Sequence, residues 1–160
     1  MDLSDLFRYS DKCRKVLREA LEANPAVWTR PIEPALQEFT TIREIAVHTA
    51  GAEERWVKMR IGGEAVPFYK DRAPVGIAEV FADWDRFRNE TYAFLGRQSE
   101  KSLQKAYHVT LGEDIWTGDL TAEQILFHVL NHETHHRAQV SMAMQQMNLD
   151  PPDFDYIFWK

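Results

Sequence analysis

Histidines are the residues of this sequence best suited to chemistry, and most of them fall in one segment. Four of the six histidines lie close together: His128, His132, His135 and His136. On a helix, His132 and His136 are one turn apart within an apolar stripe, whereas His128 and His135 lie at its edge or beyond it. Imidazoles in such a stripe need partners for their lone pairs. A shared divalent metal ion would supply one, and hydrogen bonds in the core are the alternative.

A third imidazole, that of His48, is expected beside this pair. His48 follows Ile45 by three residues and precedes Ala52 by four, so it lies beside the apolar face of its own predicted helix. Two helices can therefore direct three imidazoles to one point. Three neutral imidazoles leave one position of a tetrahedral ion open, as in catalytic sites. Such an ion lowers the pKa of a bound water or thiol, so both hydrolysis and thiol transfer are available.

Two other metal motifs overlap the same segment. His132, Glu133 and His136 match H-E-x-x-H, in which the glutamate is the general base of a metalloprotease. No His or Glu follows His136 to supply a third ligand, which disfavours this interpretation. Glu133 and His136 also form one Glu-x-x-His step of a di-iron carboxylate site, but such sites need two steps.

Hydrophobic spacing predicts the elements that position these residues. Helices are expected over residues 5–23, from Thr41 to about Gly62, from Ile77 to about Gly96 and from Thr121 to about Met147. Residues 98–120 show weak alternation and are interpreted as a loop. The fold class is therefore all-α, a four-helix bundle with long connecting loops. The aromatic tail over residues 150–159 is expected to pack back on the bundle or on a second subunit.

Composition narrows the function further. With 160 residues the chain is expected to form a single domain over 1–160, and a net charge of -6 disfavours nucleic-acid binding. No apolar stretch is long enough to span a membrane. The single cysteine, Cys13, falls in the apolar stripe of the first helix and is interpreted as a core residue. Without a disulfide pair or a signal peptide, the expected location is cytoplasmic.

Two segments of the sequence resemble the DinB family of helical-bundle metalloproteins. They are Thr41–His48 with Ala52–Trp56, and His128–Gln139. The resemblance implies that His48, His132 and His136 are the metal ligands, that the metal is zinc or nickel, and that the protein is a homodimer. Ala138 and Asn148 stand where the family often has glycine. Related enzymes activate low-molecular-weight thiols such as mycothiol or bacillithiol.

Three functions remain open from the sequence. The first is an enzyme whose metal activates a low-molecular-weight thiol for transfer to an electrophilic small molecule. The second is a hydrolase that uses metal-bound water with Glu53, Glu54 or Glu133 as base. The third is a non-catalytic metal-binding dimer of a stress response.

Several side chains are further candidates for supporting the ligands, walling the site or holding an anionic substrate: Gln139, Asn131, Glu53, Trp56, Trp84, Arg55 and Arg137.

Overall fold

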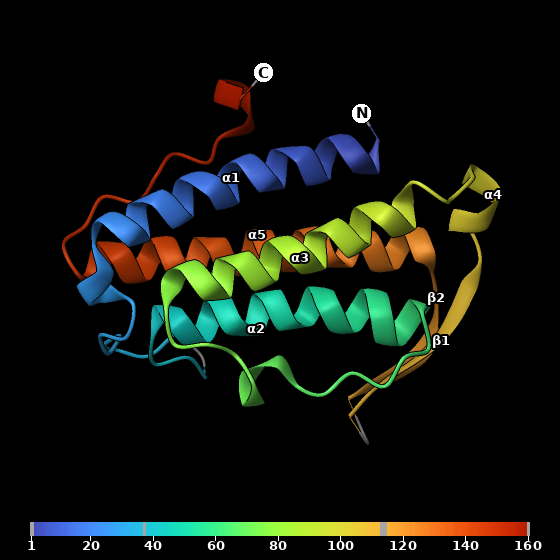
Figure 1. The fold of residues 1–160 in the computed structure, drawn as a ribbon, viewed down its shortest axis with the longest axis horizontal. Coiled ribbons are helices and arrows are strands. Elements are labelled where there is room, and N and C mark those ends of the chain that lie inside the picture. The colour runs from blue at the N-terminus through green and yellow to red at the C-terminus, as the bar shows by residue number, and fades with distance from the viewer. Residues whose placement is uncertain (1, 37, 113–114, 160) are drawn as a thin grey trace.

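Four long helices account for most of the described residues (Figure 1). The computed structural model describes residues 2–36, 38–112 and 115–159, without the side chains of residues 158 and 159. The long helices are α1 (Leu3–Ala23), α2 (Ile42–Glu54), α3 (Ile77–Leu95) and α5 (Ala122–Gln146). α1 and α2 each contact both α3 and α5, so the four lie side by side (Figure 1). Within the described residues, every helix is too short or too polar to serve as a membrane span.

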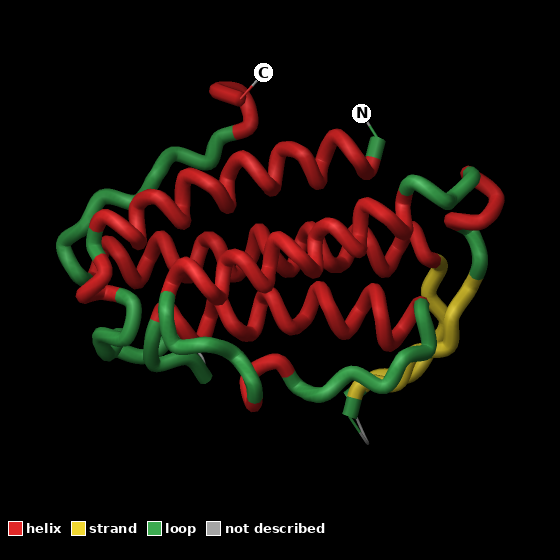
Figure 2. Tube along the Cα trace, in the orientation of Figure 1, coloured by secondary structure: helices red, strands yellow, loops and turns green. Residues whose placement is uncertain are grey.

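Short elements complete the chain between and after the long helices (Figure 2). They are the 3-10 helices η1 (Pro25–Val27), η3 (Tyr69–Asp71) and η4 (Tyr156–Trp159), the π-helix η2 (Arg55–Ile61), the helix α4 (Glu100–Leu103), and the strands β1 (Ala106–Leu111) and β2 (Trp116–Thr121).

The expectation of an all-α chain is wrong over residues 98–120. β1 pairs with β2 in an antiparallel hairpin at one end of the helices, with Val109 opposite Gly118 (Figure 2). The strands were missed because β2 is mostly polar and, within the two described strands, only Val109 is fully buried. The structure is therefore mostly helical, with one small sheet.

The predicted ends of the long helices are largely confirmed. The side chains of Thr41 and Thr121 accept hydrogen bonds from the backbone of Glu44 and Gln124, which completes both expected capping boxes. After α5, Asn148 has a φ of 61°, and the N–H of Leu149 donates to the carbonyl of Met144 at 2.9 Å. This is the Schellman arrangement that usually selects glycine, which explains why asparagine is tolerated at that position.

The tail and Cys13 also lie as expected. The hydroxyl of Tyr9 in α1 donates to the carbonyl of Phe154, and the rings of Tyr9 and Tyr156 are 5.1 Å apart. The described part of the tail therefore packs back on the helices. Cys13 is fully buried in α1, and burial raises the pKa of its thiol, which fits a core residue.

A buried ion network joins the four long helices. Arg88 of α3 is only 1% exposed, and its Nε donates to Glu53 Oε1 of α2 at 2.7 Å. Its Nη2 donates to Glu133 Oε2 of α5 at 2.5 Å, and its Nη1 donates to Asp11 of α1. Each of the other three helices thus presents a carboxylate to one guanidinium.

The charged groups of this network stabilise one another in their ionised forms. Burial disfavours the Arg88 cation, yet the charges of Glu53 and Glu133 raise its pKa well above the ordinary value. Burial likewise opposes ionisation of Glu53, but the charge of Arg88 outweighs it and lowers the pKa of that carboxyl. Trp84 Nε1 and Thr91 Oγ1 also donate hydrogen bonds to Glu53, at 3.0 and 2.8 Å, and Arg88 Nη2 donates to its Oε2 at 3.1 Å.

Replacing the arginine should destabilise the fold strongly. Arg88→Met leaves the buried carboxylate of Glu53 without its ion-pair partner, a change that costs about 3 to 5 kcal/mol of unfolding free energy. The matched control is Arg86→Met on the same helix, where the ion pair with Asp83 is at the surface and is worth about 1 kcal/mol or less. Urea denaturation followed by circular dichroism measures both variants. Equal, small losses in the two would contradict the network's role.

Candidate metal centre

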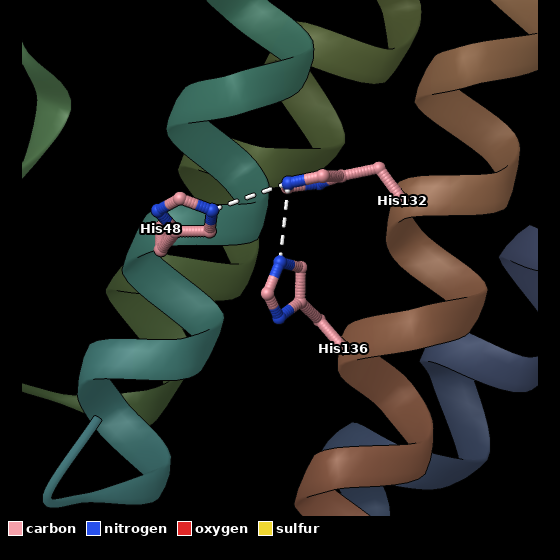
Figure 3. A group of neighbouring side chains, drawn as sticks. All are labelled: His48, His132 and His136. Atoms are coloured by element: carbon pink, nitrogen blue, oxygen red, sulfur yellow. Dashed lines mark hydrogen bonds between the residues drawn. The ribbon is translucent and has the colours of Figure 1, made fainter. Parts of the chain in front are cut away.

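The three predicted histidines converge between α2 and α5. His48 comes from the middle of α2, His132 and His136 come from the middle of α5, and their rings point toward one another (Figure 3). His132 Nε2 lies 3.2 Å from His48 Nε2 and 3.1 Å from His136 Nε2. One ligand nitrogen from each of the three lies within 4.8 Å of the others.

These separations fit a metal ion. Nitrogen ligands at 2.0–2.1 Å from a tetrahedral zinc ion are about 3.3 Å apart, close to the two measured distances. The contacts are poorly explained as hydrogen bonds alone, because the single proton that neutral His132 could place on Nε2 would be shared between two acceptors. The donor set therefore fits a divalent metal ion better than a set of core histidines.

The protonation of His136 is also appropriate for a ligand. Its Nδ1 lies 2.7 Å from Oε1 of Gln139, and because that oxygen only accepts, Nδ1 carries the proton. The lone pair of His136 is thus on Nε2, the atom that faces His132. Gln139, one of the sequence candidates for this supporting role, is 7% exposed and holds the ring in place.

Burial keeps the cluster uncharged. It lowers the pKa of His132 to about 3, with the neighbouring imidazoles adding to the effect, and that of His136 to about 4. It also lowers the pKa of His48, against the opposing charge of Glu38. Neutral imidazoles are the form that binds metal.

The other two histidines of the segment lie at the rim, as expected. His135 is exposed and His128 is half-buried, with its ring 4.5 Å from that of Trp56. Neither belongs to the group of three nitrogens.

A cleft of about 720 Å³ opens beside the cluster. His48 and His132 line it, together with Trp56, His128 and Phe39. Of the two tryptophans considered from the sequence, Trp56 is a wall of the cleft, whereas Trp84 belongs to the Arg88 network. A ligand could therefore reach the histidine nitrogens from this side.

The carboxylates expected as possible bases are occupied elsewhere. Glu53 and Glu133 bind Arg88, and Glu54 pairs with Arg72 and with Lys58. Glu133 therefore does not have the environment of a metalloprotease base, and Glu53 does not support a histidine.

The remaining side chains considered from the sequence also differ in whether they lie near the histidine cluster. Asn131 is exposed. Arg137 is buried, lies 3.6 Å from Glu133 and packs against the ring of Phe154 at 5.3 Å, so it belongs to the core. Arg55 lines the cleft. The signal that could have identified Arg88 is its place on the apolar face of α3, between Phe87 and Thr91.

Comparisons with known proteins agree with this architecture. A family model described as DinB family matches residues 1–160. A crystal structure of a DinB-like protein from Bacillus cereus ATCC 10987 superposes with a TM-score of 0.63 at 18% identity, covering 92% of this chain and 89% of that chain. A DinB-like protein from Bacillus subtilis, YjoA, gives 0.62 at 16% identity, covering 94% and 98%. No match was found among curated proteins.

Removing the amide that holds His136 should weaken metal binding. Gln139→Leu frees the ring and its tautomer, and loss of such a supporting group typically lowers metal affinity about 10- to 100-fold. Competition with a chromogenic chelator measures the zinc affinity. Gln145→Leu, at an exposed position of the same helix, is the matched control and should leave the affinity unchanged. Equal affinities in the two variants would remove Gln139 from the site.

The metal-free protein should lose stability between about pH 7 and pH 5. Imidazoles of the unfolded chain titrate near pH 6.5, whereas burial holds the pKa of His132 at about 3 and of His136 at about 4. The unfolded state therefore binds more protons in this window, and acid favours unfolding. Urea denaturation at several pH values in the presence of a chelator measures the slope. His132→Gln should flatten it, and an unchanged slope in that variant would contradict the burial of a neutral His132.

Proposed function

The chain belongs to the DinB family, and from this premise we propose that it binds a divalent metal ion, zinc or nickel, through His48, His132 and His136. The observation that carries the proposal is the convergence of three Nε2 atoms, with His132 3.2 and 3.1 Å from its two neighbours. We further propose that α1, α2, α3 and α5 act as the four-helix bundle of a single domain, and that the protein is a cytoplasmic homodimer.

We propose that the reaction is the transfer of a low-molecular-weight thiol to an electrophilic small molecule. When bound, a divalent ion would lower the pKa of a coordinated thiol enough to form the thiolate nucleophile at neutral pH. The residues of the chain would orient the site toward the cleft and shield it from water. His48 and His132 present the site to the cleft, and Trp56 and Phe39 wall it with apolar surface that limits access of water.

The paired carboxylates favour thiol transfer over hydrolysis. A hydrolase needs a base to take a proton from water, and Glu53, Glu54 and Glu133 are held in ion pairs. Glu38 and Glu44 are the carboxylates among the described residues of the cleft, and Glu44 caps α2. Glu38 is therefore the candidate base if the activity proves to be hydrolytic.

The first test of the metal site measures the metal content of the purified protein. Untagged protein should contain about one equivalent of metal by mass spectrometry, because three neutral imidazoles bind zinc tightly. His48→Ala and His132→Ala should lose it, whereas His135→Ala, at the exposed neighbouring position, should retain it. Circular dichroism checks that each variant is folded. Full occupancy in folded His48→Ala or His132→Ala would refute the three-histidine assignment.

The reaction is tested with the metal-loaded protein. Zinc- and nickel-loaded forms are mixed with bacillithiol or mycothiol and a chlorobimane electrophile, and the rate of fluorescent product is compared with that of the metal-free protein and of His132→Ala. A rate that needs both the metal and His132 supports thiol transfer. Ester hydrolysis that depends on Glu38, without thiol transfer, would replace the proposal by a hydrolase. Loss of fold on chelation without either activity would favour the non-catalytic role.

A further inference from the structure

The cleft carries a concentration of positive charge that the metal site alone does not explain. Four basic side chains line it among the described residues, Arg43, Arg55, Arg60 and Lys70, against the two carboxylates of Glu38 and Glu44. The whole chain has a net charge of -6, so this excess is local. A cleft lined by one sign of charge raises the local concentration of ligands of the opposite sign.

Of the four cations, Arg43 is held by the backbone of a neighbouring segment, whereas Arg55, Arg60 and Lys70 have no ion pair among the described residues. Arg43 Nη2 donates to the backbone carbonyls of Ala73 and Pro74, which gives it a structural role. By contrast, within residues 2–36, 38–112 and 115–159 no carboxylate lies within 4.0 Å of the nitrogens of Arg55 or Arg60.

The guanidinium of Arg55 is held in place without a counter-charge. It stacks on the ring of Phe68 at 4.0 Å, and its Nη2 makes only a long contact of 4.0 Å with the sulfur of Met59. Its Nε is buried without a hydrogen-bond partner among the described residues. Burial lowers the pKa of Arg55, and the charge of Arg60 lowers it further, so the two cations repel each other.

The π-helix brings the two arginines to one wall. In an α-helix, residues five apart point about 140° away from each other. In the π-helix Arg55–Ile61, hydrogen bonds run between residues five apart, which brings Arg55 and Arg60 closer to the same side of the helix, and both line the cleft. The N–H of Gly62 continues this pattern by donating to the carbonyl of Val57 at 3.1 Å. Such irregular helical turns are frequent at functional sites.

We propose that Arg55 and Arg60 form an anion-binding subsite for a carboxylate group of the small molecule that enters the cleft. A carboxylate offers two oxygens to the forked guanidinium and relieves the repulsion between the two cations. This inference rests on the proposed function in one respect: the molecule bound by the arginines is taken to be the one that also reaches the metal. Binding of the anion itself requires the arginines and not the ion.

The probe is succinate, with succinamide as its uncharged analogue, titrated into zinc-loaded protein by calorimetry. Succinate should bind and succinamide should not. Arg55→Met and Arg60→Met should each weaken succinate about tenfold or more, the usual effect of losing a hydrogen bond to a charged group. Arg30→Met, at an exposed position that does not line the cleft, is matched in charge and should change nothing. Arg55→Lys keeps the charge and much of the stem, and should bind succinate more weakly than the parent.

The outcomes separate this subsite from the metal site, because zinc content is measured in every variant. Succinate binding that persists in metal-free His132→Ala and is lost in Arg55→Met supports the subsite even if the proposed function fails. Binding that is lost in His132→Ala and unchanged in Arg55→Met would place the carboxylate on the metal and overturn the subsite. Failure of succinate to bind the parent, or equal binding of succinamide, would overturn it as well.

Discussion

The buried charge of Arg88 is the constraint on which the rest of the structure depends. A guanidinium that is 1% exposed must be surrounded by acceptors, and here they come from α1, α2 and α5. Glu133 directly follows His132 in the sequence, and Glu53 follows His48 by little more than one helical turn. Fixing the two carboxylates on one guanidinium therefore also fixes how α2 and α5 face each other at the histidines.

A buried ion network is not a large net source of stability, since removing charges from water costs about as much as their attraction returns. Its effect is to raise the free energy of other arrangements of the helices. A shift of α5 by one turn against α3 would separate Glu133 from Arg88 and break a buried, charge-assisted hydrogen bond. The same shift would move His132 and His136 away from His48. We infer that the network acts chiefly to fix the register of the helices, and thereby the spacing of the three Nε2 atoms.

Much of this was predictable from the sequence, because periodicity in a regular helix decides which way a side chain points. Spacing at 100° per residue placed His132 and His136 in the apolar stripe and separated them from His128 and His135. The capping boxes at Thr41 and Thr121 likewise marked real helix ends. The same geometry does not extend to tertiary partners. Glu133 matches the base of H-E-x-x-H by spacing, yet it lies on a different side of α5 from the ligands and is bound by Arg88.

Three features could not be predicted from the sequence, each for a different physical reason. The two described strands have one fully buried residue, Val109, which is too little for an alternating hydrophobic signal. The π-helix has no distinct composition, and it changes the angle between Arg55 and Arg60 that a regular helix would give. Charged residues such as Arg88 are usually at the surface, so only the surrounding apolar spacing could have indicated its burial.

A metal ion held by the three histidines would couple the two parts of the cleft by charge. Neutral imidazoles do not offset the double positive charge of a bound ion, so metal binding would add to the potential that Arg55 and Arg60 already create. Without an anion, the ion and the arginines would repel each other across the cleft; with one, each would be stabilised. Binding free energies are reciprocal, so a carboxylate held by the arginines would tighten the metal by the same factor by which the metal tightens the carboxylate. With both the proposed metal and the proposed subsite occupied, this coupling would favour molecules that carry an anionic group at one end and a metal-binding group at the other.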